Sequence, residues 1–315
     1  MPGRRPAGGL QLTDDQFEWM LSAFGASAGL LGEDEISSLD EDGYLILPPD
    51  PSYWSGRDVE LQSVRRRIDE LVAAEGWRGG IEGKENSVTA EKPLDPGSDR
   101  LGNLIEKDPV FLAFIRHPKV LAAVHHVIAA PFKCSAVDMR SPRKGGGEQQ
   151  LHVDWLPRMT EIDPFDCVFV GFYIDGMTVG NGAIRVLPGT HRKLDWPNEY
   201  IDVLSRHPDE IRVELEPGSI IVMNAQVWHA GAENRTGTLR RSIYVDYRNR
   251  RLPQLLNQKR YLSAATVARL SPEERYLLAV RAEDPPDETV SMGPGAAYRA
   301  RYGNTYLPVA DPGRA

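Results

Sequence analysis

The chain has 315 residues, of which 41% are hydrophobic and 26% are charged, and these values exclude a wholly disordered protein. No run approaches the roughly 18 consecutive apolar residues of a membrane span, and the first residues lack the apolar segment of a secretion signal. Two separated cysteines and a net charge of -8 argue against a disulfide framework and a nucleic-acid coat protein. We therefore expect a cytoplasmic protein that acts on a small molecule, with no nucleic-acid or membrane partner; the oligomeric state stays open.

The first part of the chain is predicted to be mainly helical. Residues 1–12 are rich in Gly, Pro and Arg and are expected to form a flexible tail. Thr13 and Gln16 have the spacing of a capping box, which predicts the start of a helix. Residues 44–47 form a short apolar run before two prolines, which indicates a strand. Apolar residues recur at helical spacing over residues 58–74, so we expect an amphipathic helix with a solvated charged face.

A loop and two further helices are expected next. Residues 76–100 are rich in glycine and polar residues, which predicts a long surface loop. Residues 111–128 return to helical spacing but are interrupted by Pro118, so we expect two short helices with Pro118 in the first turn of the second. Nothing nearby completes a metal set. Ordinary packing or surface roles are therefore expected for the three histidines of this segment, His117, His125 and His126.

The middle of the chain consists of short runs of Val, Ile, Phe and Tyr separated by Gly, Pro and Asn, a pattern typical of an all-β sandwich or barrel. We expect this β core over about residues 132–248, and a capped helix from Ser271 through Val280 after it. The predicted organisation is one domain over residues 13–282, followed by a Pro- and Gly-rich extension over residues 283–315. The clearest expected strands are Leu151–Trp155, Cys167–Ile174, Ala183–Leu187, Ile211–Leu215, Ser219–Asn224 and Arg241–Tyr247.

His152 and Asp154 stand two residues apart in one predicted strand. Residues at this spacing share one face of a strand and can converge on one point, although a lone motif of this kind is usually a polar pair at a strand end. His229 follows a turn and an apolar strand later in the core. Two histidines and one carboxylate on a β scaffold form the facial triad that suits non-haem Fe(II). A structural zinc site would need a fourth ligand, and no further His or Cys stands nearby.

Arg240 lies eleven residues after His229, at the start of the last predicted strand. Alternation along that strand gives a polar face with residues 240, 242, 244 and 246 and a largely apolar face with the residues between them. If the apolar face packs against the flanking helices, Arg240 points into the barrel, where a guanidinium can hold a carboxylate bidentately. The alternative is that Arg240 and Arg241 are both surface residues at the strand entrance.

Several motifs between about Leu12 and Val280 occur in a specific order. They are Asn103-Leu104, Asp108-Pro109-Val110-Phe111, His117-Pro118, His152-Val153-Asp154, Asn181-Gly182-Ala183, Pro188-Gly189-Thr190-His191, Pro217-Gly218, His229 and Arg240. Together they resemble the phytanoyl-CoA dioxygenase family of Fe(II)- and 2-oxoglutarate-dependent oxygenases. The resemblance implies a mainly β fold with flanking helices and a double-stranded β-helix core of the jelly-roll, cupin-like kind. It also implies that His152, Asp154 and His229 bind Fe(II), and that Arg240 binds the distal carboxylate of 2-oxoglutarate.

The resemblance also implies a reaction. A 2-oxoglutarate-dependent hydroxylase consumes 2-oxoglutarate and O₂, releases succinate and CO₂, and oxidises an unactivated C–H of a small molecule, here one of secondary metabolism. Halogenating relatives replace the triad carboxylate by a small residue, so the intact Asp154 favours hydroxylation over halogenation. Desaturation, epoxidation and rearrangement stay open. Trp155 and Tyr244 are candidates for the substrate pocket, although buried aromatic residues more often belong to the core.

This chain departs from the family pattern at two glycines. Gly231 stands where many relatives have a serine, so a hydrogen bond to the cosubstrate is either missing or supplied from elsewhere. Gly171 stands where some relatives have a tryptophan, which predicts extra room in the pocket. Residues 140–147 are expected to form a basic mobile loop that either closes over an anionic substrate or is simply solvated. The alternative functions are a non-catalytic barrel and a cupin-like metal protein, which would leave Arg240 unexplained.

Overall fold

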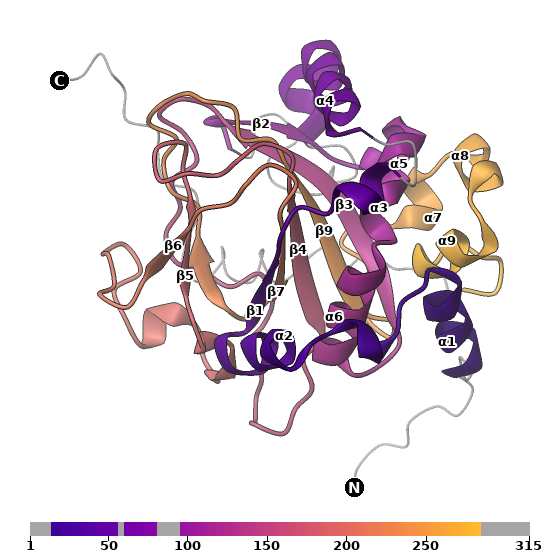
Figure 1. Cartoon of the computed structure of the whole chain (residues 1–315), viewed down its shortest axis with the longest axis horizontal. Helices are drawn as coiled ribbons and strands as arrows, with labels where there is room; N and C mark the ends of the chain where they lie inside the picture. Colours follow the sequence, from indigo (N-terminus) through magenta and orange to yellow (C-terminus); the bar gives the residue numbers. More distant parts are fainter. Residues whose placement is uncertain (1–13, 56–59, 81–94, 285–315) are drawn as a thin grey trace, which may run out of the picture.

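The structure is a computed structural model that describes residues 14–55, 60–80 and 95–284 (Figure 1). The predicted tail, the capping residue Thr13 and the chain beyond residue 284 lie outside the described residues. The described chain forms two antiparallel sheets, with helices packed along the outer face of the larger sheet. Within these ranges, no helix combines the length and apolar character needed to cross a membrane. The domain boundaries expected from the sequence stay a prediction.

The larger sheet has the strand order β1-β7-β4-β9-β3-β2, and the smaller sheet has the order β6-β5-β8. Neighbouring strands in each sheet are distant in sequence, so long-range pairing closes the two sheets around a shared interior. The strands are β1 (Tyr44–Leu47), β2 (Ser98–Leu101), β3 (Phe132–Pro142), β4 (Cys167–Tyr173), β5 (Ile184–Leu187), β6 (Ile211–Val213), β7 (Ile220–Asn224), β8 (Trp228–Ala230) and β9 (Ser242–Asn249).

The helices lie mainly before and after the β core. Pro118 occupies the first turn of its helix, as expected, and Ser271 and Glu274 form a complete capping box at the last helix. The helices are α1 (Asp14–Ala23), α2 (Glu33–Ser37), α3 (Pro51–Ser55), α4 (Leu61–Glu75), α5 (Leu104–Lys107), α6 (Pro118–Ile128), α7 (Gln258–Tyr261), α8 (Ala264–Arg269) and α9 (Pro272–Leu277), with a 3-10 helix over Pro109–Ile115.

Alternation along the strands separates two apolar cores. Ile243 and Val245 on β9 are fully buried in a large cluster that the flanking helices complete. Tyr173 and Met223 belong to a second cluster, which lies between the two sheets. The larger sheet therefore has one face covered by helices and one face turned into the barrel, where its polar residues gather.

Three expectations about local structure are wrong. Residues 151–155 form no regular strand, and only a single bridge pairs this segment with β8. The middle of the loop expected over residues 76–100 lies outside the described residues, but its ends are regular: a 3-10 helix covers Gly76–Gly80, and Ser98–Leu101 forms β2, which pairs with β3. Arg140 belongs to β3 and is 6% exposed, not part of a mobile loop. Strand β3 was not among the clearest expected strands, although Val137 and Met139 alternate with Asp138 and Arg140 as in a half-buried strand.

The charged face of α4 is only partly solvated. Arg65 donates to Asp175 at 2.9 Å and to the Ile174 carbonyl, while Asp69 accepts from Arg241 at 2.8 Å. These contacts join α4 to the segment after β4 and to the start of β9. The helix therefore fixes the position of the strand entrance that also bears Arg240.

Candidate functional site

Two histidines and one carboxylate meet at one end of the barrel. The metal-ligating atoms of His152, Asp154 and His229 all lie within 4.8 Å of one another. His229 Nε2 is 3.3 Å from Asp154 Oδ2, and His152 Nε2 is 3.7 Å from Asp154 Oδ1. Both histidines are buried, whereas 30% of the Asp154 side chain is exposed. Solvent therefore reaches the group from the side of Asp154.

The local backbone explains how these residues meet. His152 and His229 form an isolated antiparallel bridge with backbone hydrogen bonds of 3.0 and 3.1 Å. The Asp154 amide donates to the Ala225 carbonyl at 2.8 Å, in the turn between β7 and β8. The three side chains thus come together through one bridge and one turn, not through the regular strand that the sequence predicted.

A backbone carbonyl orients each histidine ring. Nδ1 of His152 lies 3.0 Å from the Gln150 carbonyl, and Nδ1 of His229 lies 2.9 Å from the Val227 carbonyl. Each Nδ1–H therefore donates to the backbone and leaves Nε2 facing Asp154, the tautomer that a metal-binding histidine needs.

The protonation states of the three side chains also suit a metal centre. Burial and the neighbouring His229 lower the pKa of His152 to about 4, which keeps that ring neutral. Burial opposes ionisation of Asp154, but the two histidines outweigh it and lower the carboxyl pKa. Burial also acts to lower the pKa of His229, yet Asp154 raises it overall. Positive charge is thus attracted to His229 Nε2, and a divalent ion bound there would take the place of the proton. This donor set fits Fe(II).

Arg240 lies inside the barrel and is 2% exposed. Its guanidinium donates to the Gly182 carbonyl and lies 3.7 Å from the Met177 sulfur, while Nε has no hydrogen-bond partner. No carboxylate of the described chain forms an ion pair with it. Arg241 instead faces the helices and pairs with Asp175 at 2.7 Å. A buried guanidinium without a counter-ion is costly, so this position fits an anionic ligand such as the distal carboxylate of 2-oxoglutarate.

Four side chains form a partly exposed surface within the barrel, which we call the inward wall. They are the residues of β3, β4 and β9 that are not fully buried, Asp138, Phe169, Tyr244 and Asp246. Asp138 stands opposite Tyr244, and Asp246 stands opposite Phe169. The Phe169 ring lies 4.9 Å from Tyr244 and 6.4 Å from His229. The inward wall therefore continues directly from the metal-binding group.

The two aromatic residues predicted for the substrate pocket have different surroundings. Tyr244 belongs to the inward wall. Trp155 is half-buried, and the Arg248 guanidinium lies over the Trp155 ring, 4.6 Å from its centroid. Arg248 also donates to Asp246 at 2.7 Å. Sequence reasoning placed Asp246 on the inward face but gave it no role, and it missed Asp138 and Phe169, because their facing depends on the register between strands.

The two family departures have local causes. A side chain at Gly231 would place Cβ 2.7 Å from the Gly147 carbonyl and 2.8 Å from Gln149 Oε1, and the Gly231 amide itself donates to Gln149 at 3.0 Å. A Cβ at Gly171 would lie 3.1 Å from the Tyr173 ring. The extra room predicted beside Gly171 is therefore absent, because Tyr173 folds back over this glycine and fills it.

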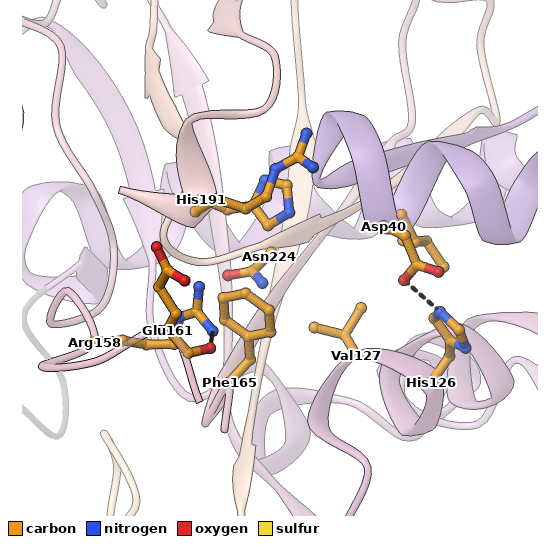
Figure 2. Close-up of a pocket in the computed structure, with 10 residues that line it drawn as sticks. Asp40, His126, Val127, Arg158, Glu161, Phe165, His191 and Asn224 are labelled. Carbon is orange, nitrogen blue, oxygen red and sulfur yellow. Dashed lines mark hydrogen bonds and ion pairs between the residues drawn. The ribbon is translucent and has the colours of Figure 1, made fainter. Parts of the chain in front are cut away.

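A cavity of about 530 Å³ lies outside the barrel, between α6 and the segment that follows Asp154. Figure 2 shows His126, Arg158, Phe165 and His191 on its walls. His126 pairs with Asp40 at 2.8 Å, and the Arg158 guanidinium lies 4.1 Å from the Phe165 ring. Because its lining includes none of the three clustered donors, this cavity is separate from the metal-binding group.

Comparison with known proteins agrees with this geometry. The family model described as phytanoyl-CoA dioxygenase (PhyH) matches residues 39–242. Dioxygenase af480 of Aspergillus fumigatus is 26% identical over 255 residues, which cover 79% of this chain and 77% of that protein. A probable phytanoyl-CoA dioxygenase of Caenorhabditis elegans is 26% identical over 260 residues, covering 72% and 78%.

Solved structures share the fold. HygX from Streptomyces hygroscopicus, with nickel, 2-oxoglutarate and hygromycin B bound, matches 69% of this chain and 87% of its own, with 16% identity and a TM-score of 0.53. The 2-oxoglutarate-dependent carbocyclase SnoK from nogalamycin biosynthesis matches 79% and 94%, with 15% identity and a TM-score of 0.53. These similarities confirm the predicted double-stranded β-helix core.

Proposed function

This chain belongs to the phytanoyl-CoA dioxygenase family of Fe(II)- and 2-oxoglutarate-dependent oxygenases, and from that premise we propose that it hydroxylates an unactivated C–H of a small molecule in secondary metabolism. The family makes the protein a 2-oxoglutarate-dependent non-haem iron dioxygenase. We assign His152, Asp154 and His229 to the iron, and Arg240 to the distal carboxylate of 2-oxoglutarate. The observation that best supports these roles is the buried Arg240, which has no carboxylate partner in the described chain.

Iron and 2-oxoglutarate supply the oxidising power when bound: 2-oxoglutarate loses CO₂ to give succinate, and one oxygen atom of O₂ enters the substrate. The protein's own residues position the reactants. The carbonyls of Gln150 and Val227 fix the two histidine rings, and Arg240 anchors the distal carboxylate of the cosubstrate inside the barrel. Burial of the histidines and of Arg240 excludes water, which strengthens each of these polar contacts.

The inward wall is the proposed substrate surface. Its two carboxylates accept hydrogen bonds, and its Phe169 and Tyr244 rings offer apolar contact. A substrate that combines hydroxyl or amino groups with an apolar ring face suits such a wall. HygX was solved with hygromycin B, and SnoK and the epimerase SnoN act in nogalamycin biosynthesis, which supports a substrate from secondary metabolism. We also propose that Trp155 lies at the edge of this wall, where Arg248 contacts both Trp155 and Asp246.

Asp154 favours hydroxylation because the carboxylate ligand is intact. The dioxygenase ausO of Aspergillus calidoustus, described as iron- and alpha-ketoglutarate-dependent, is 25% identical over 155 residues. Epimerase and carbocyclase activities occur among the structural neighbours, and they define the other products to assay. Incorporation of labelled oxygen from O₂ into the product distinguishes hydroxylation from epimerisation and ring closure.

The first test is anaerobic addition of Fe(II) and 2-oxoglutarate to metal-free protein. We expect the weak visible charge-transfer band of the iron–2-oxoglutarate chelate, and we expect Asp154→Ala to lack it. Succinate release then serves to screen polyhydroxylated and amino-bearing candidate substrates. Iron binding without the band in the wild-type protein would contradict the role of Arg240 and favour a metal-binding barrel without this cosubstrate.

A further inference from the structure

The cavity outside the barrel has the size and the chemistry of a binding site of its own. Its volume of about 530 Å³ lies within the range of about 300–1,000 Å³ that small-molecule sites occupy. In Figure 2, Arg158, Phe165 and His191 lie on one side of the cavity, and the Asp40–His126 pair lies on the other. Because the lining includes no metal-binding donor, an occupant would lie apart from the site proposed for substrate and cosubstrate.

Two arginines of the lining have no carboxylate partner among the described residues. Arg158 donates to the backbone carbonyls of Glu161 and Asp163 at 2.7 and 3.2 Å, and Arg192 donates to the Glu41 carbonyl at 2.7 Å. Burial lowers the pKa of the Arg158 guanidinium, because the charges of Asp163 and Glu161 offset it only in part. The backbone thus holds both guanidiniums in place without neutralising them, which suits the binding of an anion.

Both positive charges act on one ring, that of His191. Burial is the main cause of the low pKa of His191, about 4, and the positive charges of Arg192 and Arg158 lower it further. The two guanidiniums are therefore both close to this ring, and a single small anion beside it can lie near both.

Phe165 gives the cavity a flat aromatic surface next to these charges. The Arg158 guanidinium lies 4.1 Å from the centroid of the Phe165 ring. The His191 ring lies 5.6 Å from the same centroid, at an angle of 43°. Leu39 and Val127 add apolar contacts to the lining. A flat apolar ring can pack among these side chains while its acid group meets the arginines.

The two carboxylates of the lining act in different ways. Asp40 pairs with His126 at 2.8 Å, so the protein itself provides its partner. Glu161 forms no ion pair within the described chain and is exposed, so it opposes an anion from a position where solvent and salt screen its charge. Two guanidiniums therefore face one unpaired carboxylate, which favours a ligand of negative charge.

We propose that this cavity binds a small aromatic carboxylate, with its acid group beside the Arg158 and Arg192 guanidiniums and its ring against Phe165. The inference goes beyond the proposed function and stands apart from it, since neither iron nor 2-oxoglutarate takes part in this site.

The test titrates metal-free protein with 4-fluorobenzoate and follows the fluorine NMR signal of the probe, which broadens on binding. We expect saturable binding with a Kd of about 0.1–1 mM. Arg158→Gln and Arg192→Gln should each weaken it by at least about fivefold, and Glu161→Gln should strengthen it by about two- to threefold. The matched control is Arg251→Gln, an arginine that pairs with Asp166 outside the cavity and should bind the probe as wild type does.

Two further probes test the chemical class of the ligand. Trifluoroacetate has the acid group but no ring, and 4-fluorobenzyl alcohol has the ring but no charge. Each should bind at least about fivefold more weakly than 4-fluorobenzoate. Equal binding of trifluoroacetate would show that the ring contributes nothing, and equal binding of the alcohol would show that the arginines do not select an anion. Either result would overturn the proposal.

Arg240→Ala distinguishes this site from the barrel, where a buried guanidinium also awaits an anion. We expect Arg240→Ala to bind 4-fluorobenzoate with wild-type affinity. No saturable binding to wild type, or wild-type affinity in both Arg158→Gln and Arg192→Gln, would refute the second site. Loss of binding in Arg240→Ala alone would place the probe in the barrel and refute it as well. A missing iron–2-oxoglutarate band would instead refute the proposed function and leave this site untouched.

Discussion

The two faces of β9, continued through Arg240 and Arg241 just before it, differ in how many of their polar groups have partners within the protein. On the outward face, Arg241 pairs with Asp175 and Asp69, and the Tyr247 hydroxyl donates to the Ile115 carbonyl at 2.9 Å. On the inward face, Arg240 and Ser242 keep polar atoms without partners in the described chain. The outward face therefore serves the fold, whereas we propose that a ligand completes the inward face at Arg240. Substitutions on the two faces should separate stability from binding.

Substitution of Asp154, the proposed metal ligand next to the inward wall, should have the largest effect on turnover. Removing a residue that merely supports a ligand lowers metal affinity or activity by about 10- to 100-fold, so Asp154→Ala should lower turnover by at least about 100-fold. Succinate release with saturating Fe(II) and 2-oxoglutarate measures this loss. The matched control is Asp166→Ala, an acidic residue that pairs with Arg251 outside the donor group. Undiminished turnover in Asp154→Ala would contradict its assignment as a ligand.

The neighbouring arginines give the sharpest comparison of the two faces. Arg240→Ala removes the proposed anchor, so we expect at least about 30-fold weaker 2-oxoglutarate binding, with no fall in the free energy of unfolding of the ligand-free protein. Arg241→Ala should leave 2-oxoglutarate affinity unchanged but lower the free energy of unfolding by about 2 kcal/mol. The loss is moderate because Arg65 still contacts Asp175.

Chelate titration and chemical denaturation measure these two quantities on the same preparations. Equal losses of 2-oxoglutarate affinity in Arg240→Ala and Arg241→Ala would show that the two faces do not differ in cosubstrate binding. A large loss of stability in Arg240→Ala would show that the inward guanidinium serves the fold after all.

The same comparison explains what could be predicted from the sequence. The facing of Arg240 follows from alternation on one strand, and the His152–Asp154 spacing identifies two donors even though their segment is not a regular strand. Asp138 and Phe169 could not be placed, because they join Tyr244 only through the registers of β3 and β4 with β9. Tyr173 covers Gly171 by leaning along its own strand, a side-chain direction that alternation does not specify.

His191 tests whether a buried nitrogen without a partner always indicates a ligand. Its Nδ1 has no partner in the described chain, but Gly43 packs so closely that a Cβ there would overlap this atom, so Gly43 covers Nδ1. Burial, followed by the nearby Arg192, lowers the pKa of His191 to about 4. The folded protein therefore keeps the ring neutral, whereas the unfolded chain takes up a proton below its ordinary pKa of about 6.5.

The consequence is a loss of stability on acidification through this histidine. Between pH 7 and 5.5 the unfolded state gains the proton and the folded state does not, so His191 should lower the free energy of unfolding by about 1 kcal/mol. Denaturation of His191→Gln at both pH values should show a correspondingly smaller loss than wild type. An identical pH dependence in His191→Gln and wild type would mean that the ring takes up its proton in the folded protein. A partnerless nitrogen outside the barrel thus affects folding, whereas the partnerless Nε of Arg240 inside the barrel is the one for which we propose a ligand.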